Sequence, residues 1–336
     1  MDKVAIVILN WNGKEYLQKF LPSVVNHSRD IAKVYVADNA STDDSIDFVK
    51  QNYPEIGIII NDKNYGFAKG YNEALKKIKA QYYVLLNSDV EVSENWIQPI
   101  IDLMDNDETI SACQPKIKDY NRKNHFEYAG AAGGFIDYLG YPLCRGRIFN
   151  NLEEDKGQYD DVCEIFWATG AAMFVRASIF NELEGLDEHF FAHMEEIDLC
   201  WRMKNSGYKI MYCPASVVYH VGGGTLNKIN PKKTYLNFRN NLFLLHKNLP
   251  KKDRFRIILQ RLFLDGLAGI KLFFEGKPKH TLAIIKAHFH FYGDLKQNKR
   301  KRLKKFQPNY VGMLYKNTLF LSFFRGKQTF TEIVNS

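Results

Sequence analysis

The sequence predicts an α/β protein with a doubly wound, mostly parallel sheet flanked by helices, followed by a basic helical extension. Short β-prone apolar runs alternate with helical segments over the first hundred residues, at the spacing of βαβ units. Three predicted strands end in polar clusters, and ligands of such sheets bind at the carboxyl ends of strands. The last third of the chain is strongly basic whereas the rest is acidic, and this difference predicts that the last third binds an anionic partner.

Length and charge predict a domain followed by an appendage. The chain has 336 residues, 46% of them hydrophobic, which is enough for a full core. Residues 231–336 contain 23 Lys and Arg against 5 Asp and Glu, a net charge of +18, whereas residues 1–230 carry −10. We therefore predict a domain over 1–230, with halves at 1–110 and 111–230, and a basic extension over 231–336.

Cysteine usage and hydropathy favour a cytoplasmic protein. The five cysteines form no C-x-x-C pair and their number is odd, which favours free thiols in a reducing compartment. The chain begins directly with a strand-like run, so we expect no signal peptide. It contains no run of 18 uncharged apolar residues, so we expect no membrane-spanning helix.

The strands of the first half are predicted from short apolar runs, each ending in a polar loop. These runs are Val4–Leu9, Lys33–Ala37, Ile56–Ile60 and Tyr82–Leu86. Three helices are predicted between these strands. The first spans Lys14–Asn26, the second begins within Ser41–Asp44, and the third ends at about Lys79. Further strands are predicted near Ser111–Lys116 and over Tyr208–Tyr212.

Polar residues at the strand ends predict a nucleotide site. Asp38 is placed to accept hydrogen bonds from a base or ribose, and Asn64, Gly66 and Lys69 could face a diphosphate. Asp89 suits a hard divalent cation, which takes few protein carboxylates and completes its shell with phosphates and water. Alternatively, Asp89 only caps the following helix. The absence of P-loop and G-x-G-x-x-G motifs disfavours P-loop enzymes and dinucleotide dehydrogenases.

Four motifs in order resemble one family. The runs VAIVILNWNG, VADNASTDDS, NYGFAKGYN and LLNSDV look like the nucleotide-binding half of inverting family 2 glycosyltransferases with a GT-A fold. Within that family the likeness is greatest to the bacterial rhamnosyltransferase-like and galactofuranosyltransferase-like branch. The resemblance implies a UDP- or dTDP-sugar donor and a Mg²⁺ or Mn²⁺ ion.

The resemblance also assigns roles to residues. It implies that Asp89 is a metal ligand and that His220 completes the metal site. Asn87 stands in place of the first Asp of the family's usual D-x-D motif. A lone His is otherwise more often structural. The residues implied to bind the donor are Asn10, Asn12, Asp38, Asn39, Asn64, Gly66, Lys69, Asn72, Asn87 and Ser88.

A second motif, Glu195-Glu196-x-Asp198-x-x-x-Arg202, resembles the family's catalytic acidic motif. The likeness puts Glu196 in the position of the general base, where Asp is commoner, and leaves Glu195 and Asp198 as alternatives. Acids also open helices for electrostatic reasons alone, so a purely structural role for the cluster is the competing interpretation.

The segment Glu164–Ser178 is predicted to form a strand or bend, and it resembles the family's acceptor-facing stretch. Trp167, Thr169 and Gly170 are the residues implied to contact the acceptor. Alternatively, Trp167 is a core residue, as most large aromatics are. Residues 121–151 lack a clear period and are expected to form an acceptor-side insertion.

The extension is predicted to contain amphipathic helices over Tyr235–Leu249, Arg254–Glu275 and Thr281–Leu295, followed by the basic run Lys296–Lys305. Their apolar and basic residues favour docking on an anionic membrane surface over packing on the body. Nucleic acid is disfavoured because no recognition motif is present and the basic run lacks aromatics. As an appendage, the extension could be removed without necessarily stopping donor hydrolysis.

Taken together, these features predict a metal-dependent, inverting glycosyltransferase that acts in cell-surface polysaccharide synthesis. The acceptor would be a hydroxyl of a glycan or lipid-linked glycan, and the enzyme would lie in the cytoplasm, peripheral on the inner face of the cell membrane. One alternative is a sugar nucleotidyltransferase, which would want a Gly-rich basic loop after the first strand. The other is a non-catalytic membrane adaptor built on the same sheet.

Overall fold

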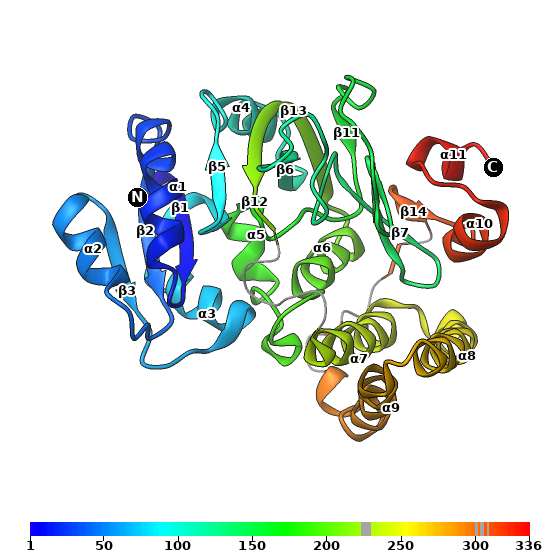
Figure 1. The fold of residues 1–336 in the computed structure, drawn as a ribbon. Coiled ribbons are helices and arrows are strands. Elements are labelled where there is room, and N and C mark those ends of the chain that lie inside the picture. The colour runs from blue at the N-terminus through cyan, green and yellow to red at the C-terminus, as the bar shows by residue number, and fades with distance from the viewer. Residues whose placement is uncertain (223–229, 300–301, 303–305, 308) are drawn as a thin grey trace.

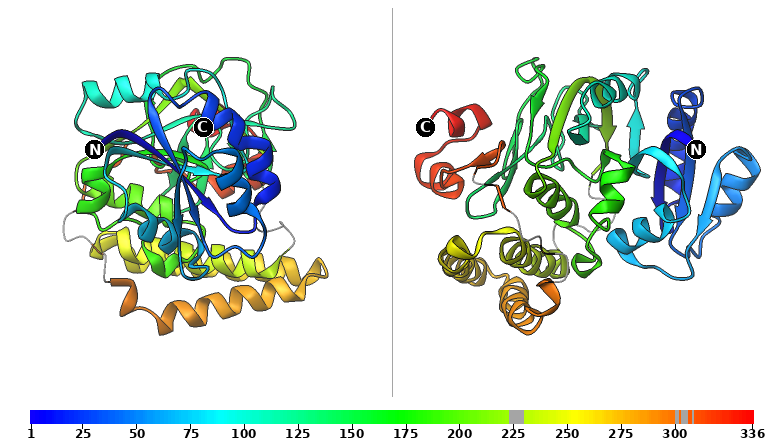
Figure 2. Two further views of the ribbon diagram at one scale, coloured as in Figure 1. Left: turned by 90° about the vertical axis from the view of Figure 1, so that its left-hand side faces the viewer. Right: turned by 180° about the vertical axis from the view of Figure 1, so that it is seen from behind.

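The computed structural model describes residues 1–336 apart from 223–229, 300–301, 303–305 and 308 (Figure 1). The glycines at 223 and 224, and half of the predicted basic run Lys296–Lys305, therefore lie outside the described residues. Helices cover both faces of a central sheet, and the C-terminal helices form a further layer along one side of the molecule (Figure 2).

The first half of the central sheet is parallel, as predicted. Its strands are β1 (Asp2–Asn10), β2 (Ala32–Asp38), β3 (Gly57–Ile60) and β4 (Ala80–Asn87), in the order β3-β2-β1-β4. Asn10 is in register with Asp38, and Leu9 with Asn87. The polar ends of these strands therefore meet at one edge of the sheet.

The second half of the sheet is mixed. Its strands are β5 (Val90–Val92), β6 (Ile110–Asp119), β11 (Cys163–Glu164), β12 (Ala172–Arg176) and β13 (Lys209–His220). β12 runs antiparallel between β4 and β6, and β13 pairs in parallel with β6. Of the segment predicted over Glu164–Ser178, Glu164 belongs to β11 and Ala172–Arg176 form β12. Between them, the backbone of Phe166 and Trp167 hydrogen-bonds to Gly134. β13 extends beyond its predicted end and brings His220 beside β5.

Two cores explain the continuous apolar strands. Ala5 and Val7 of β1 face one core, whereas Val4, Ile6 and Ile8 face the other. A strand covered on both faces needs no polar alternation. The covering helices are α1 (Lys14–Asn26), α2 (Ser45–Asn52) and α4 (Gln98–Asn106) on one side, and α3 (Gly66–Leu75), α5 (Ala177–Glu182) and α6 (Glu195–Asn205) on the other.

The region that the sequence left without a period forms a second, smaller sheet. Its order is β10-β9-β8-β7-β14, with β7 (Gly134–Asp137), β8 (Pro142–Cys144), β9 (Arg147–Ile148), β10 (Asn151–Leu152) and β14 (Met313–Leu314). β14 comes from the extension and pairs in parallel with β7. The extension is therefore joined to the body by backbone hydrogen bonds.

The extension continues as α7 (Pro231–Asn248), α8 (Lys251–Phe274), α9 (Pro278–Gly293), η2 (Gln297–Lys299), α10 (Thr318–Arg325) and α11 (Phe330–Val334). The predicted helices are present, with somewhat earlier starts. Leu242, Phe243, Leu244 and Leu245 of α7 are fully buried in the same core as α6. Truncation at residue 230 would open this core, which argues against the expectation that donor hydrolysis could survive removal of the extension. The division at residue 230 stays a prediction.

Candidate active site

Asn10, Asp38 and Ser41 form a buried polar cluster where β1 and β2 end. The Nδ2 of Asn10 donates to Asp38 Oδ1 at 2.9 Å, and the backbone N of Ser41 donates to Asp38 Oδ2 at 2.8 Å. The Oδ1 of Asn12 accepts from the backbone N of Thr42 at 2.7 Å. These bonds hold the two loops together. Asp38 Oδ1 also accepts from Ser41 Oγ at 2.5 Å, so further acceptor capacity lies on Oδ2, and the role of Asp38 toward a ribose or base stays a prediction.

The loop before α3 is shaped by short-range amide contacts. Gly66 has φ +74°, its backbone N donates to Asn64 Oδ1 at 2.9 Å, and its carbonyl accepts from Asn39 Nδ2 at 3.0 Å. A Cβ at Gly66 would lie 2.7 Å from the ring of Phe191, so both the conformation and the space require glycine. The ammonium of Lys69 lies 3.6 Å from Glu188 Oε2, at the surface.

Asn72 has a different place from the other predicted donor residues. Its Nδ2 donates to the carbonyl of Leu186 at 2.9 Å, and its Oδ1 accepts from the backbone N of Leu186 at 3.0 Å. The Nδ2 also lies 3.3 Å from Glu188 Oε1. This buried amide therefore ties α3 to the segment that precedes α6. A role of Asn72 in donor binding stays a prediction, because both polar atoms of its side chain already make hydrogen bonds within the protein.

Asp89 and His220 lie together where β4 and β13 end. The Nε2 of His220 is 3.1 Å from Asp89 Oδ1, and Asn87 Nδ2 is 3.4 Å from the same nitrogen. Two ligands on adjacent positions of an octahedral ion, each about 2.1 Å from it, lie about 3 Å apart. The pair therefore fits the chemistry and spacing of a divalent cation. Among the described residues no group of three or more His, Cys, Asp or Glu could hold a metal, so other ligands would have to come from donor phosphates and water. Ser88, which separates Asn87 and Asp89 in the chain, is half-buried.

Glu127 was missed by the sequence interpretation. Its Oε2 lies 3.3 Å from His220 Nδ1, and both side chains are buried. A carboxylate on the second ring nitrogen orients a metal-ligating imidazole and fixes its tautomer. Burial alone would lower the pKa of His220, but the charges of Glu127 and Asp89 raise it to about 10. Glu127 comes from the region without a period, where no sequence signal marked it.

The acidic motif begins α6 after a strained turn. Phe191, His193 and Met194 have φ of 66°, 69° and 74°, a conformation that L-residues rarely adopt. Asn240 of α7 supports this turn, because its Nδ2 donates to the carbonyls of Phe190, Ala192 and His193 at 2.8–3.0 Å. Strain of this kind persists where surrounding contacts impose it and is frequent at functional sites.

Glu195 and Glu196 each have one carboxyl oxygen without a partner. The Oε2 of each is buried and has no hydrogen-bond partner among the described residues. Burial raises the pKa of Glu196 to about 7, although backbone N–H groups partly oppose the shift. Burial and the neighbouring Glu196 charge raise the pKa of Glu195 well above its ordinary value. Perturbed carboxyl groups that lack partners are candidates for proton transfer.

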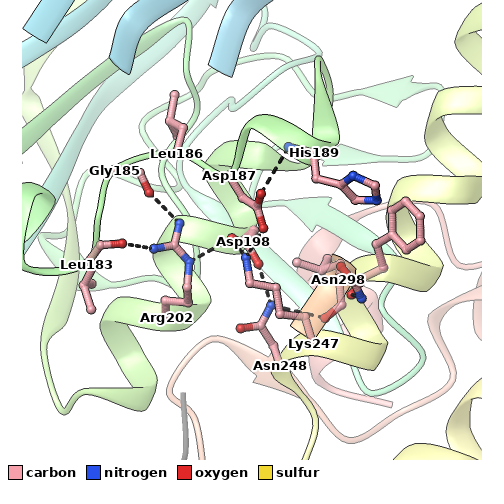
Figure 3. Close-up of polar contacts among 12 residues, drawn as sticks. Leu183, Gly185, Leu186, Asp187, His189, Asp198, Arg202, Lys247, Asn248 and Asn298 are labelled. Atoms are coloured by element: carbon pink, nitrogen blue, oxygen red, sulfur yellow. Dashed lines mark hydrogen bonds and ion pairs between the residues drawn. The ribbon is translucent and has the colours of Figure 1, made fainter. Parts of the chain in front are cut away.

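Asp198 has a different environment, although it belongs to the same motif. Its Oδ2 accepts from Arg202 Nε at 2.8 Å and from Lys247 Nζ at 2.7 Å, and its Oδ1 accepts from Asn248 Nδ2 at 2.8 Å (Figure 3). Lys247 also contacts Asp187 at 2.6 Å. Burial would raise the pKa of Asp198, but the charges of Lys247 and Arg202 lower it overall. This fully engaged carboxylate favours a structural role over the alternative that Asp198 is the base.

Replacing Lys247 with methionine is expected to lower the free energy of unfolding by about 3–5 kcal/mol. Asp187 would lose its cationic partner, and Asp198 would keep Arg202 as its one cationic partner among the described residues. Urea denaturation followed by circular dichroism measures the change. Lys76→Met is the matched control, since that side chain is 65% exposed beside Glu73 and should contribute little. A loss below about 1 kcal/mol for Lys247→Met would show that the buried network does not hold α7 to α6.

The predicted acceptor segment links the two halves of the site. The carbonyl of Ala171 accepts from the backbone N of Asn87 at 3.0 Å, and the backbone N of Ala168 contacts the Sγ of Cys200 in α6 at 3.4 Å. Trp167 is only 4% exposed and its indole N–H donates to the carbonyl of Phe135 at 2.7 Å. This placement agrees with the core interpretation of Trp167.

Thr169 and Gly170 are also enclosed. Thr169 is buried, and its backbone N donates to Gln114 Oε1 at 2.9 Å. A Cβ at Gly170 would lie 2.8 Å from the ring of Phe67. Glycine is therefore required for close packing here, and a role of the segment toward the acceptor stays a prediction.

Comparison with known proteins agrees with the predicted family. Residues 5–183 match the model of Glycosyl transferase family 2. N-acetylglucosaminyl-diphospho-decaprenol L-rhamnosyltransferase of Mycobacterium tuberculosis is 23% identical over 237 residues, which cover 65% of this chain and 76% of that protein. The low-salt glycan biosynthesis hexosyltransferase Agl10 of Haloferax volcanii is 21% identical over 299 residues, covering 86% and 91%.

A solved structure supports the fold assignment. The mannosyltransferase PcManGT from Pyrobaculum calidifontis, in complex with GDP-Man and Mn²⁺, aligns with a TM-score of 0.54 at 13% identity and covers 87% of each chain. The arrangement of sheet and helices is that of the GT-A glycosyltransferases, as the sequence predicts. The match to Glycosyl transferase family 2 covers more than half of the chain, so the chain belongs to that family. It is a glycosyltransferase, and neither a nucleotidyltransferase nor an adaptor is favoured.

Proposed function

We propose that the chain transfers a sugar from a nucleoside-diphosphate sugar to an acceptor hydroxyl with inversion, in a reaction that depends on a divalent metal. The observation that carries this proposal is the approach of His220 to Asp89 at the strand ends of a family 2 fold, backed by Glu127. Mg²⁺ or Mn²⁺ bound there would neutralise charge on the departing diphosphate. Asp89 and His220 would hold the ion, and Glu127 would orient His220.

Glu196 is the proposed general base. With its pKa raised to about 7 by burial, it is partly ionised near neutral pH and is suited to accept the proton of the acceptor hydroxyl. A single base opposite the leaving group leads to inversion at the anomeric carbon, without a covalent intermediate. Burial and the Glu196 charge raise the pKa of Glu195 well above its ordinary value, and this disfavours its ionised form, so Glu195 is the weaker candidate.

The proposed donor is a UDP- or dTDP-sugar. Asn10, Asn12, Asp38 and Asn39 would shape the nucleoside side of the site, and the loop before α3 would face the diphosphate. The relatives are named for rhamnosyl and hexosyl transfer, one of them to a diphospho-decaprenol. A glycan or lipid-linked glycan acceptor in cell-surface polysaccharide synthesis is proposed by analogy. Such an acceptor would place the enzyme at the inner face of the cell membrane.

The test is release of nucleoside diphosphate from a panel of UDP- and dTDP-sugars, with Mn²⁺, with Mg²⁺ and with EDTA. The proposal expects metal-dependent release with at least one donor, increased by an acceptor. Formation of pyrophosphate from a nucleoside triphosphate and a sugar phosphate would instead identify a nucleotidyltransferase. A rate of nucleoside diphosphate release that is unchanged in EDTA would contradict the proposed dependence on a divalent metal.

Replacing Glu127 with glutamine is expected to weaken Mn²⁺ binding by about 10–100-fold, the usual effect of removing the partner that orients a metal-bound histidine. The His220 ring would lose the charged acceptor at its Nδ1 while Asp89 stays unchanged. Mn²⁺ affinity in the presence of UDP, measured by electron paramagnetic resonance, checks this without turnover. Glu154→Gln is the control, because Glu154 is exposed in the same region and pairs with Lys156. Equal affinity of the two variants would remove Glu127 from the site.

A further inference from the structure

The helix α8 exposes large apolar side chains, although an ion pair lies on its buried face. The face of α8 that is buried against the body carries Arg261 and Asp265, which pair at 2.8 Å. The guanidinium of Arg261 also donates to the carbonyl of Leu139 at 3.2 Å and lies 3.7 Å from the centre of the Tyr141 ring. The inner face of α8 therefore combines this ion pair with apolar residues such as Ile257, and further apolar residues remain on its outer side.

The outward side of α8 is a continuous apolar row at helical spacing. It consists of Phe255, Leu259, Phe263, Leu267, Ile270 and Phe274, which are 48–83% exposed. A shorter row on α9 consists of Leu282, Ile285, Phe289 and Tyr292, which are 47–72% exposed. Single exposed apolar residues are ordinary, but contiguous rows of this size mark an interaction surface.

The two rows belong to one layer. α9 packs beside α8, with Thr281 Oγ1 donating to the carbonyl of Gly269 at 2.9 Å and His288 Nε2 lying 3.3 Å from Asp265 Oδ2. Figure 2 shows both helices at the outer edge of the molecule, beyond α7. α10 extends the surface, since the ammonium of Lys271 lies 5.4 Å from the centre of the Phe323 ring. We call the exposed side of α8, α9 and α10 the basal surface.

Basic residues surround these rows. Residues 251–293 contain nine Lys and Arg against three Asp and Glu, a net charge of +6. Lys251, Lys252, Arg256, Lys277 and Lys279 are all exposed. Lysine and arginine beside an outward apolar row are typical of helices that lie in the interface of an anionic bilayer.

We propose that the basal surface docks on an anionic lipid bilayer, with the apolar side chains of α8 and α9 inserted below the headgroups and the surrounding Lys and Arg on lipid phosphates. A symmetric contact between two copies is disfavoured, because it would oppose one positively charged rim to another. Among the described residues, no helix is both long and apolar enough to cross a membrane. The inference rests on the proposed function in one respect: docking would bring the enzyme to the lipid-linked acceptor proposed above.

The experiment is co-sedimentation of the full chain with vesicles of phosphatidylcholine alone or with 30% phosphatidylglycerol, without donor or acceptor. We expect binding to the anionic vesicles that 0.5 M salt weakens but does not abolish, because apolar burial is not screened. Phe263→Ser combined with Phe289→Ser should weaken binding by about tenfold or more. Lys277→Gln combined with Lys279→Gln should weaken it several-fold on anionic vesicles only.

Two controls separate docking from its alternatives. Val162→Ser removes an apolar side chain that is 51% exposed and adjoins β11, a strand far from α8 and α9 (Figure 1), and it should leave binding unchanged. The indole fluorescence introduced by Phe263→Trp should be quenched by brominated lipid, whereas that introduced by Val162→Trp should not. Absence of vesicle binding, or a self-association that the Phe263→Ser and Phe289→Ser pair abolishes, would overturn the proposal. Because no sugar transfer is measured, either result leaves the proposed reaction to its own test.

Discussion

Replacing Asp89 with alanine is expected to lower transfer by about 10³-fold or more while the fold is retained. Its carboxylate is the acidic member of the pair proposed to hold the metal, and such an ion contributes several kcal/mol to leaving-group stabilisation, at 1.36 kcal/mol per tenfold in rate. Asp89 lies at a strand end and packs against His220 rather than deep in the core. The variant should therefore keep its circular dichroism spectrum.

The measurements for Asp89→Ala are the rate of nucleoside diphosphate release and the affinity for Mn²⁺ in the presence of UDP. Both should fall together. Asp102→Ala, on the exposed side of α4, is the control and should match the wild type in both. A variant that is inactive but binds Mn²⁺ normally would give Asp89 another role, and full activity would remove it from the mechanism.

Replacing Glu196 with glutamine is expected to lower turnover by ~10²-fold or more, the usual contribution of a general base, while donor and metal affinity persist. Glutamine is nearly isosteric, so the strained turn before α6 should be preserved. Glu195→Gln should be milder, because burial and the Glu196 charge raise the pKa of Glu195, which disfavours the ionised form that a base needs. A severe loss with Glu195→Gln and a mild one with Glu196→Gln would reverse the assignment.

The raised pKa of Glu196 also predicts a pH profile. A base must be ionised, and a pKa of about 7 means that Glu196 is protonated and inactive below that value. The ratio kcat/KM should therefore fall as pH drops through about 7, rather than through the ordinary range of a glutamate near 4.3. In Glu196→Gln this limb should disappear, and its persistence would assign the titration to another group.

The sequence alone was sufficient to predict the parallel half of the sheet, because its apolar strands are covered on both faces and each ends in a polar loop. It also predicted the pairing of Asp89 with His220, although only through a family resemblance. It did not identify Glu127, whose segment has no period and whose partner, His220, is 93 residues away in the chain. Nor could it separate Glu196 from Asp198, since that distinction depends on Lys247 of α7, which local patterning does not reveal.

The position of β12 has a consequence for how the chain folds. This strand lies between β4 and β6 and hydrogen-bonds to both, so the sheet is incomplete until residues 172–176 have arrived. Contacts between segments so far apart require closure of long loops, which slows folding. During synthesis, β4 would present an open edge while nearly ninety further residues are made. An isolated fragment 1–110 would keep that edge, a template for pairing with other chains, and so would tend to aggregate rather than bind nucleotide.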